Sequence, residues 1–253
     1  MSKLLSIITP TYKDKKIFET YESIKNLLQN RLVEWVVIDG FVDERNNLGE
    51  QIGNIQGVKY LNQKDDGIYD AMNKGIKNAD GDYLWFLNGG DALIMNDADL
   101  MSEIEKGKND GHQWLKFNFS INKKIRDERI SPIFLILNSP NHQASILSRK
   151  LFLPRAYNSN LNLAADYQMF LEIFFIAKIK PFAISQALFN YDLEGITSKP
   201  EQKNKIRQER IASTKNVLNA NFHPYLLLAW VLQIFVYFPF IMVPSLKFKR
   251  FHD

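Results

Sequence analysis

The stretch DDGIYDAMNKGIKNADGDYLWFLNGGD, residues 65–91, decides the fold of this 253-residue chain. It joins an acidic turn, a helical segment over residues 68–77, an apolar run over residues 83–87 and a second turn that ends in Asp91. A short apolar run bounded by turn residues is typical of a strand that is buried on both faces. Such strands belong to helix-covered parallel sheets, whose ligands bind beyond the carboxyl ends of the strands.

The same alternation of short apolar runs and amphipathic stretches fills the first hundred residues, and it predicts an α/β fold whose mostly parallel central sheet is flanked by helices. The other strands of this half are predicted over residues 4–9, 34–38 and 58–61, and the other helices over residues 16–28, 44–54 and 97–106. The alternation weakens after Gly111 and indicates a mixed arrangement. There we expect strands over residues 114–120, 144–147 and 182–188, and helices over residues 167–177 and 199–218.

Size and composition predict one globular domain over residues 1–198 with a helical extension over residues 199–253. With 45% hydrophobic and 24% charged residues, the chain can bury one substantial core. It contains no cysteine, which excludes a disulfide framework, a thiolate zinc site and a cysteine nucleophile, and fits a cytoplasmic protein. The first apolar stretch is too short for the central region of a signal peptide, so we expect no export.

The extension has the composition of a membrane-surface segment. It carries nine basic residues against three acidic ones, and residues 225–243 contain no charged residue. Gln233, Pro239 and Pro244 interrupt this apolar segment, which therefore suits an interfacial or re-entrant segment better than a plain spanning helix. The alternative is a C-terminal helix that packs on the core. We expect contact with the inner face of the cell membrane, and no binding of nucleic acid.

Polar residues follow the predicted strands at the points where those strands end. They are residues 9–12, Asp39, residues 65–66 and residues 88–91. If the strands are parallel, all four groups lie at the same edge of the sheet. Any one of the aspartates taken alone is explained equally well as a turn or helix-capping residue. Four groups at one edge predict a ligand site.

These segments together resemble the inverting family 2 glycosyltransferases of the GT-A fold, and in particular bacterial enzymes that build capsule, O-antigen or colanic-acid-type exopolysaccharides. The resemblance rests on SIITPTY at residues 6–12, VVIDG at residues 36–40, DGIYDAMNKGI at residues 66–76 and GDYLWFLNGGD at residues 81–91, with shorter matches at residues 141–144 and 164–167. It implies a nucleotide-sugar donor, most simply a UDP-sugar, and a lipid-linked glycan acceptor.

The resemblance also implies roles for residues at the nucleoside. Pro10 and Tyr12 offer a flat apolar contact for a uracil ring, and Asp39 offers an acceptor for its N3 proton. Asp65 would line the nucleoside site. Lys74 would face the phosphates from the helix that begins after Gly67, although a surface lysine without that role is an equally good interpretation.

A second set of implied residues surrounds the diphosphate. Asp91 matches the final carboxylate of the DxD-type motif, which with the two phosphates holds Mg²⁺ or Mn²⁺. Asn88 and Gly90 stand where other members often have aspartate, and Gly89 lets the sugar phosphate approach the backbone. His142 would lie beside the donor sugar or the diphosphate, with a purely structural histidine as the alternative.

Inversion by direct displacement requires a base that takes the proton of the acceptor hydroxyl, and the resemblance assigns this role to Asp166. Asp166 precedes an apolar helical run, so a helix N-cap is the alternative and compatible interpretation.

The sequence thus predicts an inverting, metal-dependent glycosyltransferase that moves a hexose or an amino sugar onto a lipid-linked glycan. The alternative is a membrane-associated protein that binds a nucleotide sugar with little turnover, because the motif at residues 88–91 is reduced. A nucleotidyltransferase and a dinucleotide-dependent oxidoreductase are disfavoured, because no glycine-rich loop follows the first predicted strand.

Overall fold

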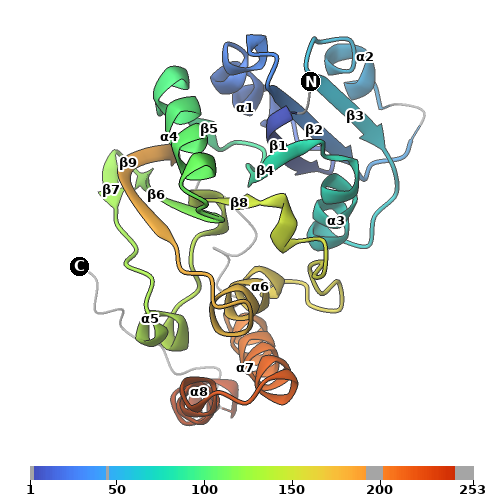
Figure 1. Cartoon of the computed structure of the whole chain (residues 1–253). Helices are drawn as coiled ribbons and strands as arrows, with labels where there is room; N and C mark the ends of the chain where they lie inside the picture. Colours follow the sequence, from blue (N-terminus) through green and yellow to red (C-terminus); the bar gives the residue numbers. More distant parts are fainter. Residues whose placement is uncertain (1–2, 44–45, 192–201, 243–253) are drawn as a thin grey trace. The chain divides into compact units, whose positions relative to one another are not determined.

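The computed structural model describes residues 3–43, 46–191 and 202–242, and the chain divides into two compact units (Figure 1). The first unit comprises Met1–Arg129, Asn141–Asn162 and Ile179–Leu193, and the second comprises Ile130–Pro140, Leu163–Lys178 and Glu194–Asp253. The predicted boundary between residues 198 and 199 lies outside the described residues and stays a prediction. The segment that carries Asp166 groups with the C-terminal helices rather than with the sheet.

The first unit is built on a nine-stranded sheet with the order β3-β2-β1-β4-β8-β6-β9-β5, in which β7 pairs with β6. The strands are β1 Lys3–Thr11, β2 Val33–Asp39, β3 Val58–Asn62, β4 Gly81–Phe86, β5 Ala92–Leu93, β6 Trp114–Ile121, β7 Lys124–Arg126, β8 Ser145–Ser148 and β9 Phe182–Asn190. Strands β3, β2, β1 and β4 are parallel, whereas β8 runs antiparallel to both β4 and β6. The prediction of a mostly parallel sheet is therefore wrong for the sheet as a whole, because parallel pairing follows helical crossovers and these dominate only the first hundred residues.

Four helices belong to this unit: α1 Ile17–Ile24, α2 Leu48–Ile52, α3 Ile68–Asn78 and α4 Asp97–Asn109. The predicted helix over residues 16–28 is shorter than expected, since α1 ends at Ile24 and a separate 3₁₀ turn covers Leu27–Gln29. The helix predicted over residues 44–54 is much shorter in the structure, where α2 covers only Leu48–Ile52. Gly49 has a low helix propensity, and Gly53 is the C-cap residue at which the helix ends. Residues 44–45 lie outside the described part of the chain.

The buried hydroxyl of Thr9 in β1 links this strand to β2 and to the end of β4. This hydroxyl donates to the carbonyl oxygen of Leu87 at 2.7 Å and accepts from the indole nitrogen of Trp35 at 2.8 Å. Helix α3 rests closely on the same strands, because a Cβ atom built at Gly75 would lie 2.4 Å from Cγ2 of Ile8. These contacts hold β1, β2 and β4 in one fixed arrangement.

The second unit consists of α5 Pro132–Leu137, α6 Ala165–Leu171, α7 Lys203–Ala220 and α8 Pro224–Met242, and α6 continues as a π-helical turn over Glu172–Ile176. Sequence patterns did not predict α5, which Ser131 caps by accepting the Phe134 N–H at 3.1 Å. Gln233 of α8 is buried, and its amide donates to the carbonyl oxygen of Ile136 at 3.0 Å and to the Tyr167 hydroxyl at 2.8 Å. The polar residue that interrupts the apolar segment therefore points into this unit.

Within the described residues, the structure contains no helix with the length and apolar character needed to cross a membrane. The basic residues Lys247, Lys249 and Arg250 lie outside the described part of the chain.

Candidate functional site

The carboxylate of Asp39 lies at the end of β2, in register with Thr11 of β1. It is 1% exposed; Oδ1 accepts from the Phe41 N–H at 2.9 Å, and Oδ2 accepts from the Asn46 side-chain amide at 2.7 Å and from the Tyr60 hydroxyl at 2.8 Å. Burial and the hydrogen bond to this carboxylate raise the pKa of Tyr60. Because a carboxylate accepts about four hydrogen bonds, these contacts leave room for one further donor.

Asp65, a second residue predicted at the nucleoside, lies against Gly40, the residue that follows Asp39. A Cβ atom built at Gly40 would lie 2.0 Å from Oδ2 of Asp65, so this carboxylate rests directly on the glycine backbone. Oδ1 of Asp65 accepts from the Gly67 N–H at 3.0 Å. Sequence reasoning missed the role of Gly40, although a glycine directly after a strand-end aspartate is the signal of such a close approach.

We expect Gly40→Ala to weaken the binding of UDP, the nucleotide that the resemblance implies, by about tenfold, because the new methyl group must push the Asp65 carboxylate away. Asp65→Ala should weaken UDP binding equally. The double variant should bind no more weakly than either single variant, since both changes remove the same contact between the Asp65 carboxylate and the nucleotide. Isothermal titration calorimetry measures the three affinities, with Asp66→Ala as the control for charge loss in the same turn. Additive losses in the double variant would contradict the shared role.

Two buried oxygen atoms mark the same edge of the sheet. Thr11 is 7% exposed and ends β1, and Asn88 follows β4. Among the described residues, neither Oγ1 of Thr11 nor Oδ1 of Asn88 has a hydrogen-bond partner. Buried polar atoms in folded proteins are normally bonded, so these two atoms indicate that a ligand completes the site.

The residues predicted to stack on the base flank Thr11. Pro10 lies within β1, paired with Ile38 of β2, whereas the Tyr12 side chain is largely exposed just beyond the strand. The Tyr12 ring contacts Phe41 edge-on, with 5.7 Å between the ring centroids. The exposed ring is accessible to a planar ligand, and its stacking role stays a prediction.

The turn that carries Asp91 is held by the hydroxyl of Thr20 in α1. This hydroxyl donates to the main-chain oxygen of Asp91 at 2.9 Å and accepts from the Gly90 N–H at 3.0 Å. Gly90 has a φ of +89°, which favours glycine. A Cβ atom built at Gly89 would lie 2.9 Å from a carboxylate oxygen of Asp14. Thr20 and Asp14 were both missed, because they lie about 70 residues from this turn along the chain.

Asp91 suits the predicted role of metal ligand. The residue is 3% exposed. Its main-chain N–H donates to the carbonyl oxygen of Asn88 at 3.2 Å, so Asp91 and Asn88 belong to one tight turn. Mg²⁺ and Mn²⁺ prefer such oxygen ligands. In the part of the chain that is described, no group of three or more His, Cys, Asp or Glu side chains could hold a metal ion. The role of Asp91 as a metal ligand stays a prediction.

Gln143 anchors the turn His142–Ala144 to the end of β4. Its side-chain oxygen accepts from the Asn88 N–H at 2.8 Å, and its main-chain oxygen accepts from the Trp85 indole at 2.7 Å. The structure thus brings the turn that contains His142 beside the Asn88 turn, and the contact of His142 with a donor stays a prediction. Gln143 itself is buried and serves to position this turn.

An ion pair between Lys116 and Glu128 supports the turn that contains His142. Lys116 is 3% exposed, and its ammonium lies 3.1 Å from Oε2 of Glu128, which also accepts from the Asn141 N–H at 2.9 Å. Burial lowers the pKa of Lys116 and outweighs the opposing effect of Glu128. Glu128 holds the start of the His142 turn through its bond to Asn141, and Lys116 holds Glu128 in place. Removing either partner of the ion pair would leave the other charge poorly compensated.

Lys74 is engaged within its own helix. Its ammonium lies 2.7 Å from Oδ2 of Asp70, one turn earlier in α3, and it also donates to the carbonyl oxygen of Lys64. The hydrogen bond from Lys74 lowers the pKa of Asp70. This arrangement fits the structural alternative for Lys74, and its contact with phosphate stays a prediction.

Asp166 lies in the second unit, in the first turn of α6. The residue at the N-cap position is Ala164, so the interpretation of Asp166 as the helix cap is wrong. The helix begins at Ala165, two residues earlier than expected, and Glu209 accepts the N–H groups of the two residues before it, Leu163 at 2.7 Å and Ala164 at 3.0 Å. Oδ1 of Asp166 accepts from the Tyr167 N–H at 2.8 Å, and the side chain is half-buried.

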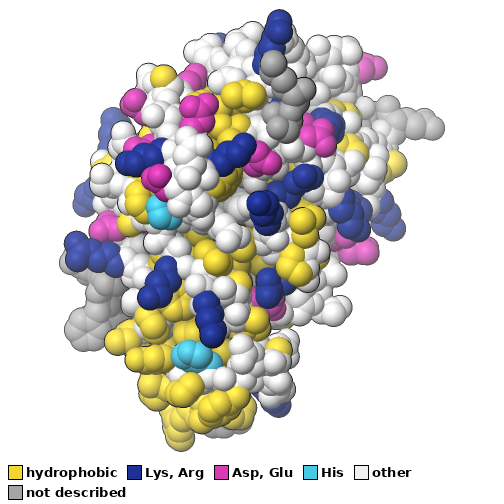
Figure 2. Space-filling view, in the orientation of Figure 1, with side chains coloured by type: hydrophobic (Ala, Val, Ile, Leu, Met, Phe, Trp, Pro, Cys, Tyr) yellow, Lys and Arg dark blue, Asp and Glu magenta, His cyan; other side chains and the backbone are white. Residues whose placement is uncertain are grey.

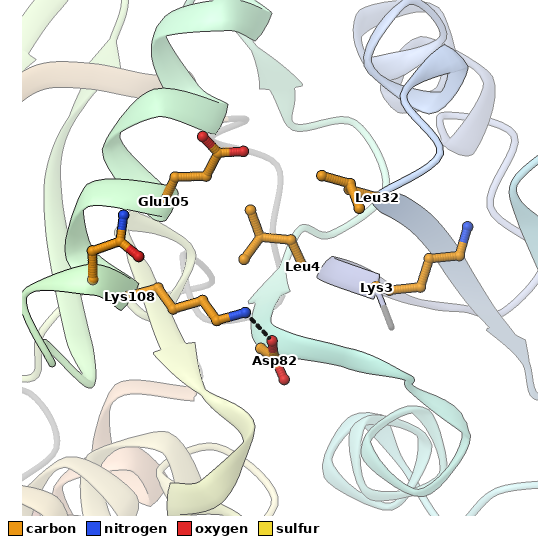
Figure 3. Close-up of a pocket in the computed structure, with 7 residues that line it drawn as sticks. Lys3, Leu4, Leu32, Asp82, Glu105 and Lys108 are labelled. Carbon is orange, nitrogen blue, oxygen red and sulfur yellow. Dashed lines mark hydrogen bonds and ion pairs between the residues drawn. The ribbon is translucent and has the colours of Figure 1, made fainter. Parts of the chain in front are cut away.

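A pocket of ≈ 270 Å³ lies at the opposite end of the strands (Figure 3). Its lining includes Lys3 at the start of β1, Asp82 near the start of β4, and Lys108 of α4, whose ammonium lies 2.7 Å from Oδ2 of Asp82. The polar strand ends described above are at the carboxyl edge, so this pocket is separate from the candidate site.

Comparisons with known proteins identify the family and the fold. A protein of Mycobacterium tuberculosis described as an uncharacterized glycosyltransferase is 27% identical over 212 residues, which cover 78% of each chain. The crystal structure of residues 1–349 of Staphylococcus aureus TarS in complex with UDP-GlcNAc has a TM-score of 0.67 at 18% identity, covering 92% of this chain and 73% of that one.

A mannosyltransferase from Pyrobaculum calidifontis, solved with GDP-mannose and Mn²⁺, has a TM-score of 0.63 at 12% identity and covers 97% of this chain and 77% of that one. These likenesses show the GT-A fold. The sequence pattern of glycosyl transferase family 2 matches residues 6–153, which include the Asp39, Asp65 and Asp91 strand ends and the His142 turn. The chain therefore belongs to glycosyl transferase family 2.

Proposed function

We propose that this protein is an inverting glycosyltransferase that moves a hexose or an amino sugar from a UDP-sugar to a lipid-linked glycan acceptor, as in the synthesis of capsule, O-antigen or a related exopolysaccharide. The observation that carries the proposal is the first-unit strand edge, where Asp39 ends β2 and the Asp65 carboxylate lies against the next residue, Gly40. The unsatisfied buried oxygens of Thr11 and Asn88 mark the same edge.

The donor would be held by groups of different chemistry. Asp39 has one remaining acceptor position for the N–H of a uracil, and the exposed Tyr12 ring provides a stacking surface. Gly89 and Gly90 give the sugar diphosphate access to the backbone. Asp91 and the diphosphate would hold Mg²⁺ or Mn²⁺, which when bound neutralises the charge that develops on the departing diphosphate.

Asp166 would act as the general base. In the single displacement step, an acceptor hydroxyl oxygen forms a bond to the anomeric carbon while the bond from that carbon to the diphosphate oxygen breaks. The hydroxyl proton passes to the Asp166 carboxylate, and the electron pair of the broken bond leaves with UDP. Attack from the face opposite the leaving group inverts the configuration.

The reduced motif at residues 88–91 favours one competing function, a protein that binds a nucleotide sugar with little turnover. Purified protein with Mn²⁺, tested against UDP-, GDP- and dTDP-sugars, separates the two. The transferase predicts nucleotide release with UDP-sugars, and faster release when a membrane extract containing lipid-linked glycans is added. Tight nucleotide binding without release from any donor would favour the binding protein.

We propose further that one face of α8 contacts the inner membrane surface. Four apolar side chains on this helix, spaced by three or four residues, are 37–74% exposed: Tyr225, Leu228, Leu232 and Phe235. Such spacing places them on one side of a helix. Figure 2 shows hydrophobic side chains gathered over α8. Another side of the helix, with Leu226, Ala229 and Gln233, is buried.

An apolar face followed in sequence by Lys247, Lys249 and Arg250 suits anionic lipid headgroups. Membrane contact would also bring the enzyme to an acceptor that cannot leave the bilayer. Truncation before Phe222 would remove the buried residues of α8 along with its exposed face, so substitutions on the exposed face are the sharper test.

The variant Leu228→Ser/Leu232→Ser/Phe235→Ser is expected to lose binding to vesicles of phosphatidylglycerol and phosphatidylethanolamine. Each lost side chain removes about 1.5 kcal/mol of apolar transfer energy, so the partition coefficient should fall by at least a hundredfold. Co-flotation measures it, with the exposed first-unit residues in Ile125→Ser/Leu153→Ser as the control. Unchanged flotation of the triple variant would contradict membrane contact by this face. So would a wild-type protein that is a dimer and a triple variant that is a monomer, because the face would then bind a second copy of the chain.

A further inference from the structure

Glu209 of α7 is a nearly buried carboxylate that supports the segment before Asp166. It is 9% exposed, and a single oxygen, Oε2, accepts from the main-chain N–H groups of Leu163 at 2.7 Å and Ala164 at 3.0 Å. All of these residues belong to the second unit. The contact joins positions that are 45 and 46 residues apart in the sequence.

The contact fixes the two residues at the entry to α6, Leu163 and the N-cap residue Ala164. The first N–H groups of a helix lack partners within it, and a capping side chain usually supplies one. Ala164, at the N-cap position of α6, has no polar side chain that could do so. An ionised acceptor forms stronger hydrogen bonds to main-chain N–H groups than a neutral one. Glu209 therefore determines where the chain enters α6, two residues before Asp166.

We propose that Glu209 is the positioning residue of the catalytic base. It holds Leu163 and Ala164 so that the Asp166 carboxylate, in the first turn of α6, has one orientation toward the acceptor hydroxyl. The inference rests on the proposed function, in which Asp166 is that base. Misplacement of a catalytic group by about 1 Å can cost about 10²-fold in rate, so a residue that never touches the substrate can still control turnover.

Other contacts keep α7 attached to α6 when the Glu209 carboxylate is removed. The Tyr167 and Thr214 hydroxyl oxygens lie 3.3 Å apart, and the Arg210 guanidinium carbon lies 4.5 Å from the centre of the Tyr167 ring. Val217 of α7 is fully buried. The loss of Glu209 should therefore act on the entry to α6 and leave the packing of the helices in place.

The test compares Glu209→Ala and Glu209→Gln with the control Val217→Ala. Glu209→Ala should lower kcat by about 10²-fold while the donor KM stays within about twofold, because the donor residues lie in the other unit. Glu209→Gln keeps an acceptor oxygen and should recover most of the rate. Val217→Ala creates a small cavity in the same helix and should lower the melting temperature without changing kcat at 20 °C.

Amide hydrogen exchange provides a readout that does not depend on activity. The N–H groups of residues 163 and 164 should exchange faster in Glu209→Ala than in the wild type, and at wild-type rates in Val217→Ala. If Glu209→Ala does not fold, Glu209→Asp, which withdraws the carboxylate by one methylene group, should show the same loss of kcat and of protection.

The outcomes separate this inference from the proposed function. If Asp166→Asn abolishes turnover but Glu209→Ala and Glu209→Asp keep the wild-type kcat, the transferase mechanism stands and the positioning role is wrong. If Asp166→Asn retains turnover, the assignment of the base is wrong and the positioning role falls with it. Equal losses in Glu209→Ala and Val217→Ala would show a general effect of stability and would also overturn the inference.

Discussion

Asp166→Asn is expected to lower the rate of sugar transfer by about 10³-fold, because the amide cannot take the proton of the attacking hydroxyl. The fold should persist: Oδ1 of Asp166 accepts the Tyr167 N–H, and the asparagine side-chain oxygen can accept the same bond. UDP affinity should stay within about twofold of wild type, since the residues proposed to bind the nucleotide lie in the first unit.

Initial rates with a UDP-sugar and a lipid-linked acceptor measure the loss, and calorimetry measures UDP binding. Asp99→Asn is a matched control, because Asp99 is also an acidic residue in the first turn of a helix and has no proposed role. A rate in Asp166→Asn within tenfold of that in Asp99→Asn would show that another group removes the proton.

Asp91→Asn is expected to lower the rate of metal-dependent turnover by about 10³-fold, since a neutral amide binds Mn²⁺ far more weakly than a carboxylate does. The turn itself should survive, because its bonds to Thr20 and Asn88 use the main chain of Asp91. In the wild type, removal of metal with EDTA should produce the same loss, and added Mn²⁺ should restore the rate.

The neighbouring carboxylate provides the control for this second substitution. Asp14 lies against Gly89 at the same turn, so Asp14→Asn removes one negative charge from the same neighbourhood. Titration of turnover with Mn²⁺ should give a wild-type curve for Asp14→Asn and no activation for Asp91→Asn. Activation at the same Mn²⁺ concentration in Asp91→Asn would remove Asp91 from the metal site.

The sequence predicted the parallel half of the sheet closely. The expected strands over residues 34–38 and 83–87 correspond to β2 Val33–Asp39 and β4 Gly81–Phe86. These segments are continuous apolar runs bounded by turn residues, and a run that is buried on both faces carries its pattern in its own residues. The placement of Asp39 at a strand end followed from the same local signal, as did that of Asp91 in the turn after β4.

The second half of the sheet, which mixes parallel and antiparallel pairs, was harder to predict. Strand β5 spans only Ala92–Leu93, and the residues of β7, Lys124–Arg126, are exposed. Both form because a partner strand, β9 or β6, supplies hydrogen bonds. Helix α5 is likewise only six residues long, too short to show a helical period. Pairing of this kind depends on contacts between distant segments, which leave no period in the sequence.

The sequence alone determined the strand ends, the family and the identity of the acidic residues that carry the proposed chemistry, because each is written in a short run of neighbouring residues. Only the tertiary structure decided that Asp65 rests on Gly40, that Gln143 holds the Asn88 turn, and that Glu209 holds the two residues at the entry to α6. Each of these contacts joins side chains to backbone groups far away in the chain, and folding brings them together through packing that no local pattern records.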